Sequence, residues 1–158
     1  MFEVSRFWLI VLNVLVILTI HLGISLALNR IPLKWFNPQH FLFRIRDFEK
    51  NPRFYTHKLK VKKWKTYIPD GARLFRSGFQ KRALAGDSRQ YLSTFMLETC
   101  RAELTHWLQM VPFFVFFLWN PWWSALAVCV YLFLANMPCI LLQRHNRYRL
   151  LRVLDITR

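Results

Sequence analysis

One stretch constrains the fold of this chain more than any other, because Phe7 to Leu28 is a run of 22 residues without Lys, Arg, Asp or Glu. An α-helix of that length spans the ~30 Å hydrocarbon core of a bilayer. A secretory signal peptide is the competing explanation, but its apolar run is shorter and ends at a small-residue cleavage site. Only one basic residue, Arg6, precedes this run. The sequence therefore predicts a retained transmembrane helix.

Two further apolar runs lie in the second half of the chain. Trp122 to Leu142 is long enough to cross a bilayer, whereas Trp107 to Trp119 has only 13 residues, about 20 Å of helix. A predicted tight turn in the aromatic sequence NPWW fixes the far end of this shorter run. Either the shorter run dips into the bilayer and returns, or the polar residues before it enter the membrane. We expect three spans, at about 7–28, 100–119 and 122–142.

The distribution of charge predicts the orientation of these spans. The chain carries 23 Lys and Arg against 8 Asp and Glu, and almost all of this basic charge follows the first span. Because basic segments stay on the cytoplasmic side, we expect the N-terminus outside and residues 29–99 and 143–158 in the cytoplasm. Anionic membrane lipid is the expected partner, and nucleic acid is not, since no nucleic-acid motif accompanies the charge.

These features predict an all-α membrane protein with three transmembrane helices and a basic cytoplasmic interfacial region. The whole chain, 1–158, is expected to form one multi-pass domain in the cell membrane. Assembly into a homo-oligomer stays open.

The expected cytoplasmic region contains patterns suited to a membrane surface. Asn37 is a predicted N-cap with Pro38 behind it, and Phe41, Ile45 and Phe48 then recur at helical spacing. This pattern predicts a short amphipathic helix in the headgroup plane.

The basic stretch from Lys58 to Lys65 alternates loosely and predicts a short strand or an extended arm. It is either a solvated basic face beside lipid or a clamp for a phosphorylated or carboxylated ligand. Further along, Pro69 to Gly71 predicts a turn, and Asp87 with Gln90 predicts a helix start of the capping-box type.

The most reactive residues gather in ETCRAELTHW, at the edge of the second span. Polar side chains at membrane depth are costly and usually face protein or a water-filled cavity. His21 and Asn136 lie about 10 Å from the cytoplasmic ends of their own spans, and His106 with Gln109 is expected at a similar depth. The three spans therefore predict a pocket that opens toward the cytoplasm.

His106 lies three residues after Glu103, and a histidine beside a carboxylate is the usual general-base pair. Two alternatives stay open. Glu98, Arg101, Glu103 and His106 can satisfy one another as a buried ion cluster, or Glu-x-x-His can bind metal, although di-iron bundles need two copies. Cys100 is a further candidate as a covalent nucleophile.

A donor-rich cluster follows the third span, with Arg144, Asn146, Arg147 and Arg149. It is either a positive-inside stop signal or a phosphate contact, because forked guanidinium groups suit phosphates.

Three motifs, RAELTHW, KVKKWKTYIPDG and ANMPCILLQRHNRYRL, resemble the glycosyl-4,4'-diaponeurosporenoate acyltransferase family. Its members are small integral-membrane proteins of the staphyloxanthin-type carotenoid pathway. The resemblance implies esterification of a fatty acid onto the primary 6-hydroxyl of the glucose of a glycosylated carotenoid. The family pattern does not require a cysteine at Cys100, which disfavours an acyl-enzyme.

We therefore expect a membrane acyltransferase that esterifies a sugar hydroxyl of a glycosylated carotenoid or similar glycolipid, with acyl-CoA or acyl-carrier protein as donor. His106 is the expected general base, oriented by Glu103 or Glu98, with Arg101 steadying the acyl carbonyl or the carboxylates. The expected substrate-binding residues are His21, Gln109, Asn136, Lys62, Lys63, Lys65, Arg144, Asn146, Arg147 and Arg149. No metal or cofactor is expected. The competing hypothesis is a non-catalytic scaffold whose polar cluster locks helices together.

Overall fold

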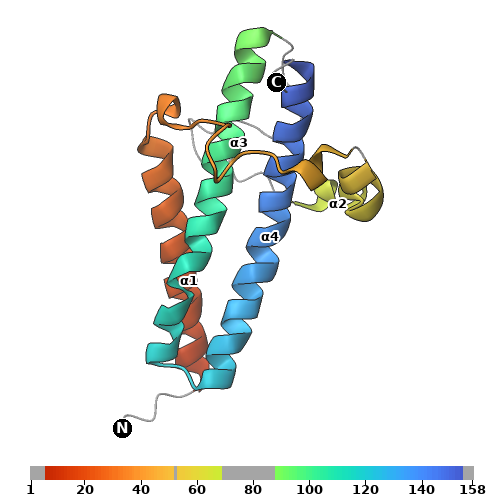
Figure 1. Cartoon of the computed structure of the whole chain (residues 1–158). Coiled ribbons are helices and arrows are strands. Elements are labelled where there is room, and N and C mark those ends of the chain that lie inside the picture. The colour runs from red at the N-terminus through yellow and green to blue at the C-terminus, as the bar shows by residue number, and fades with distance from the viewer. Residues whose placement is uncertain (1–5, 52, 69–87, 155–158) are drawn as a thin grey trace.

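Three long helices dominate the computed structural model, which describes residues 6–51, 53–68 and 88–154. They are α1 (Arg6–Arg30), α3 (Arg89–Met110) and α4 (Trp122–Val153). α3 and α4 lie antiparallel along each other, and α1 packs against α3 (Figure 1). The shorter elements are η1 (Leu33–Trp35), η2 (Asp47–Lys50), η3 (Phe54–Lys58), α2 (Val61–Trp64), η4 (Lys65–Tyr67) and η6 (Val111–Leu118). The described residues form no strand, so the all-α prediction is confirmed for them.

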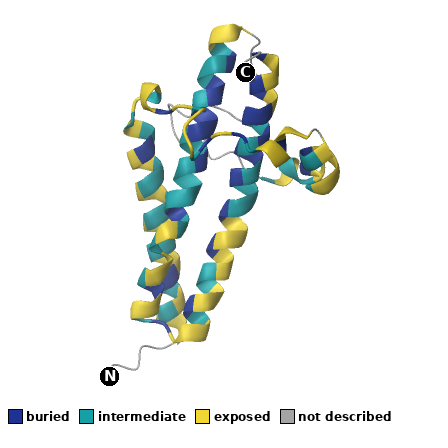
Figure 2. Ribbon diagram, in the orientation of Figure 1, coloured by how far each residue is buried: buried dark blue, intermediate teal, exposed yellow. Residues whose placement is uncertain are grey.

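Two helices, α1 and α4, are long and apolar enough to cross a membrane. Only 6% of the most apolar 18-residue stretch of α1 and 22% of that of α4 is buried, so neither resembles the core helix of a water-soluble domain. Figure 2 shows exposed residues along α1 and the first half of α4, whereas buried residues gather in the second half of α4 and the first half of α3. The first and third predicted spans therefore lie in helices whose apolar side chains face outward, as lipid contact requires.

The predicted second span, 100–119, is divided between two elements. α3 ends at Met110 and the chain tightens into η6, where Pro112 departs from helical geometry (φ −74°, ψ 16°). Proline has no N–H to continue the helical hydrogen bonds, which explains the break. Val111, Phe113 and Leu118 of η6 are exposed, like many apolar side chains of α1. Whether this segment crosses the bilayer stays a prediction.

Ser88 caps the start of α3, because its hydroxyl accepts the backbone N–H of Tyr91 at 3.2 Å. A helix beginning near this point was predicted. Asp87 and the predicted turn from Pro69 to Gly71 lie outside the described residues.

The predicted amphipathic helix after Asn37 is wrong. Residues 38–44 form turns, and only η2 is helical in this part of the chain. Asn37 accepts the N–H of Gln39 at 2.9 Å, which is an Asx turn and not a helix cap. The physical reason lies far away in the sequence, because the carbonyl groups of this segment accept hydrogen bonds from arginines of α4.

The basic stretch is also helical and not a strand or an extended arm. Val61 begins α2 and is fully buried, while Lys62 and Lys63 point outward. Trp64 donates its indole N–H to the carbonyl of Leu59 at 2.8 Å, which closes the turn before α2.

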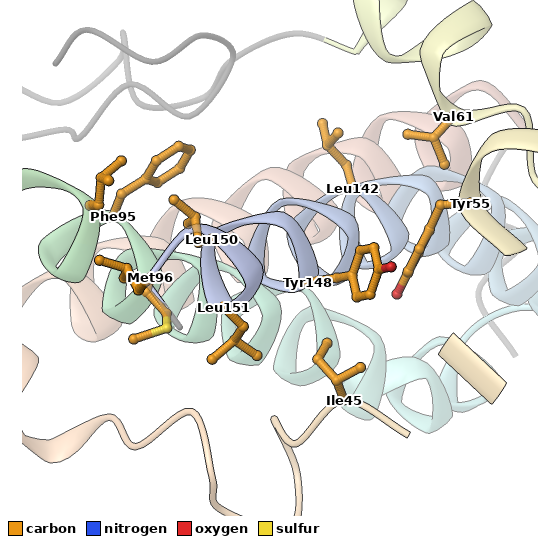
Figure 3. Close-up of a cluster of buried hydrophobic side chains, with 11 residues drawn as sticks. Ile45, Tyr55, Val61, Phe95, Met96, Leu142, Tyr148, Leu150 and Leu151 are labelled. Atoms are coloured by element: carbon orange, nitrogen blue, oxygen red, sulfur yellow. The ribbon is translucent and has the colours of Figure 1, made fainter. Parts of the chain in front are cut away.

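A hydrophobic cluster fastens this folded segment to the long helices (Figure 3). Ile45, Tyr55 and Val61 of the segment pack with residues of α3 and α4. The partners from the two helices are Leu92, Phe95, Met96, Leu142, Tyr148, Leu150 and Leu151. The described residues between α1 and α3 that carry these side chains are therefore part of the folded unit.

Candidate active site

Glu103, at the middle of α3, is fully buried between two arginines of α4. Its carboxylate accepts a hydrogen bond from Nη1 of Arg144 at 2.7 Å and another from Nη2 of Arg147. The indole N–H of Trp107 donates to the same carboxylate at 3.4 Å. Two charge-assisted bonds thus join α3 to α4 where both helices are buried.

Arg144 also bridges to the segment after α1. Its Nε and Nη2 donate to the two oxygens of Glu49 at 2.8 and 2.5 Å, a forked contact that fits a carboxylate. Tyr55 donates its hydroxyl to Glu49 at 2.6 Å, and the backbone N–H of Arg46 donates at 2.7 Å. Burial alone would raise the pKa of the Glu49 carboxyl, but these hydrogen bonds outweigh burial and lower that pKa below its ordinary value of 4.5.

Arg147 is fully buried and uses its remaining donors on its surroundings. Its Nε donates to the carbonyl of Phe43 at 3.0 Å, and Nη1 lies 3.4 Å from Oγ1 of Thr99 and 3.7 Å from Sγ of Cys100. We call Glu49, Glu103, Arg144 and Arg147 the buried ion cluster. Its two carboxylates and two guanidiniums balance in charge, which is the condition for burying ions at tolerable cost.

A second ion pair lies nearer the end of α1. Glu98 and Arg101 approach to 3.2 Å on α3. Nη1 of Arg101 donates to the side chain of Asn29 at 2.9 Å, and Nη2 donates to the carbonyl of Ile31 at 3.3 Å. This pair therefore ties α3 to the end of α1.

His106 makes its contact with a different residue. Its Nδ1 lies 2.9 Å from Oδ1 of Asn136, which joins the half-buried imidazole on α3 to the buried amide on α4. Gln109, one turn along α3, donates to the carbonyl of His21 at 3.2 Å and to the hydroxyl of Ser25 at 3.1 Å. The polar residues that the sequence placed at one depth thus link α3 to both neighbouring helices.

A family model described as glycosyl-4,4'-diaponeurosporenoate acyltransferase matches residues 32–156 of the chain. The chain belongs to this family. Proteins of that name from Staphylococcus aureus strains RF122 / ET3-1 and MRSA252 are each 35% identical to the chain, over 98% of its length and 88% of theirs. The protein of that name from strain USA300 is 34% identical over the same shares. No solved structure matches the chain significantly.

Membership confirms the resemblance seen in the three sequence motifs and makes the protein an acyltransferase. The competing hypothesis of a non-catalytic scaffold is therefore not supported. The buried ion cluster therefore belongs to an enzyme, in which some polar residues hold the helices together and others are available for chemistry.

The predicted site residues of the acyltransferase have different partners in the structure. Glu103 was expected beside His106, but its described contacts go to Arg144, Arg147 and Trp107, because a buried carboxylate is held best by full positive charges. Arg144 and Arg147 were expected at a phosphate and are engaged with carboxylates. Glu49 and Tyr55 were not predicted at all.

Three cations of the acyltransferase outside the buried ion cluster lie near His145. Burial lowers the pKa of the imidazole of His145, which is only 5% exposed, and the positive charges of Arg149, Lys65 and Lys62 lower that pKa further. The ring of His145 lies 5.0 Å from that of Tyr55, and in the described chain its Nδ1 has no hydrogen-bond partner. Lys62 and Lys65, from one predicted phosphate-binding stretch, and Arg149, from the other, therefore all lie near His145.

No group of three His, Cys, Asp or Glu residues is placed to hold a metal ion within residues 6–51, 53–68 and 88–154. Cys100 is fully buried against the guanidinium of Arg147, so an acyl donor has no direct path to its sulfur in this conformation.

Proposed function

We propose that this acyltransferase esterifies a fatty acyl group onto a sugar hydroxyl of a membrane-embedded glycosylated carotenoid, with acyl-CoA or acyl-carrier protein as donor. The names of the relatives describe an acceptor of this kind. The structural observation that carries the proposal is the place of His106, which joins α3 to α4 through Asn136 beside apolar, outward-facing surface.

The position of Asn136 along α4 sets the depth of this site. Asn136 lies 14 residues after Trp122, about 21 Å along the helix, and Arg144 lies 22 residues after Trp122, about 33 Å along it. If α4 crosses from Trp122, the buried ion cluster lies at the membrane boundary and His106 lies about 10 Å inside it. An acceptor with a lipid-embedded tail can present its sugar at that depth.

The proposed chemistry uses His106 as general base. As the sugar hydroxyl oxygen attacks the thioester carbonyl of the donor, its proton passes to the imidazole. The carbon–sulfur bond then breaks, and the imidazolium returns the proton to the leaving thiolate. Atoms and charge balance without a metal or a cofactor. The Glu98–Arg101 pair, at the end of α1, is proposed to border the entrance to this site.

The orientation proposed for the enzyme is N-terminus outside, with the buried ion cluster and Lys62, Lys65 and Arg149 at the cytoplasmic face. Acyl-CoA does not cross membranes, so inverted and right-side-out vesicles containing the enzyme and the glycosylated carotenoid distinguish the two orientations. We expect ester product, measured by mass spectrometry, from inverted vesicles supplied with acyl-CoA or acylated carrier protein. Equal activity of intact right-side-out vesicles would contradict the orientation, and no ester in permeabilised vesicles with either donor would contradict the proposed function.

For the phosphates of the donor we propose Lys62, Lys65 and Arg149, since their charges converge on His145. Replacing Lys62 or Arg149 by alanine is expected to raise KM for acyl-CoA by about tenfold with little change in kcat, because a hydrogen bond to a charged group contributes ~1.5–3 kcal/mol. The effect should shrink at high salt. Lys34→Ala, an exposed lysine of η1, is the charge-matched control. An unchanged KM in both variants would count against this phosphate site.

A further inference from the structure

Asn136 lies within hydrogen-bond distance of the imidazole of His106, and its own position is tightly fixed. The side chain is 2% exposed on α4. Its Nδ2 donates to the carbonyl of Leu132, one turn earlier in the same helix, at 2.8 Å. Its Oδ1 lies 2.9 Å from Nδ1 of His106.

These two contacts determine which way the amide points. Nδ2 is a donor and a backbone carbonyl is an acceptor only, so the nitrogen must face Leu132. The reversed amide would place two acceptor oxygens against each other in a buried site, at a cost of an unsatisfied hydrogen bond. The oxygen of Asn136 therefore faces His106.

An amide oxygen can only accept, so Nδ1 of His106 must carry the proton of this hydrogen bond. In a neutral imidazole the other nitrogen, Nε2, then holds the lone pair. We propose that Asn136 is a positioning residue that fixes His106 in the Nδ1–H tautomer and so makes Nε2 the basic atom. This inference rests on the proposed function of His106 as general base.

An amide suits this task at membrane depth better than a carboxylate. A buried carboxylate would stabilise the imidazolium more strongly, but it would also place an unpaired charge about 10 Å inside the bilayer. Asn136 gives the direction of the hydrogen bond without that charge. The carboxylate next along α3, Glu103, is meanwhile neutralised by two arginines.

A pair of variants separates positioning from packing. Asn136→Leu and Asn136→Asp both lose the donation to Leu132, but only aspartate keeps an acceptor for His106. We expect the leucine variant to lose about 10- to 100-fold in kcat, the range for outer-shell partners of histidine, with KM for the acceptor nearly unchanged. The aspartate variant should recover most of this loss.

Nitrogen-15 NMR of the histidine side chains in detergent supplies the second readout. His106 is assigned by the signal lost in His106→Gln, and its nitrogen shifts report which ring nitrogen carries the proton. We expect the Nδ1–H form in the wild-type enzyme and in Asn136→Asp, and a shift toward the Nε2–H form in Asn136→Leu.

Two outcomes would overturn the role of Asn136: a wild-type tautomer and normal kcat in the leucine variant, or equal losses in both variants with an unchanged tautomer. The first case, combined with an inactive His106→Gln, would leave the proposed function standing. Full activity of His106→Gln would instead remove the general base itself.

Discussion

Replacing Glu103 by glutamine is expected to lower the free energy of unfolding by about 3–5 kcal/mol, the usual cost of removing one partner from a buried ion pair. Glu103 is fully buried and is shared by Arg144 and Arg147, so its loss leaves two buried guanidiniums with the charge of Glu49 alone. Thermal or denaturant unfolding of the detergent-solubilised enzyme measures the effect.

The matched control is Asp47→Asn, because the carboxylate of Asp47 is 96% exposed and pairs with Lys50 on the surface. This variant should unfold like the wild-type enzyme. Adding Arg147→Met to Glu103→Gln should restore part of the stability, since it removes one of the uncompensated charges. Wild-type stability of Glu103→Gln alone would show that the buried ion cluster does not hold the helices together.

The long helices were predictable because their signals are uniform over many residues. α1 and α4 each contain an apolar run of membrane-spanning length, and no competing local pattern interrupts it. The segment 100–119 was harder, because α3 carries Glu98, Arg101 and Glu103 before the apolar residues begin. Those charges pair inside the helix bundle, a tertiary fact that hydropathy does not report.

The failed helix after Asn37 shows how a distant partner can override local periodicity. Phe41, Ile45 and Phe48 have helical spacing, yet the carbonyls of Leu42, Phe43 and Arg44 accept from Arg144 and Arg147. A regular helix would have used those carbonyls for its own hydrogen bonds. Since the arginines lie about a hundred residues away, no local sequence pattern predicts these hydrogen bonds.

Contacts in the candidate site were predictable where two residues on different helices lie at the same depth in the bilayer. His106 and Asn136 were expected at one level in the bilayer, and the structure joins them. The partners of the charged residues were not predictable, because 23 basic residues compete for 8 acidic ones and sequence spacing cannot choose among them. Glu49 was missed for this reason, since its fork with Arg144 spans 95 positions. The scarcity of carboxylates was the available signal that the buried ones, Glu49, Glu98 and Glu103, are paired.

His106→Gln is expected to reduce acyl transfer per folded molecule by about 10²–10⁴-fold, the usual effect of losing a general base. Glutamine keeps polarity and approximate size and can still meet the amide of Asn136, so insertion and thermal stability in detergent should stay near those of the wild-type enzyme. Two quantities are measured for each variant. The first is the thermal stability of the purified protein, and the second is the amount of ester formed from acyl-CoA and the glycosylated carotenoid per folded molecule.

His57→Gln, an exposed histidine on η3, controls for the loss of an imidazole and should keep normal activity. Glu103→Gln gives the opposite pattern from His106→Gln, because its buried carboxylate binds arginines of α4: stability falls, while the molecules that remain folded keep most of their activity. The two substitutions thus separate chemistry from assembly within four positions of one helix. Normal activity per folded molecule in His106→Gln would show that the imidazole only joins α3 to α4, and a general base would then have to be sought elsewhere in the chain.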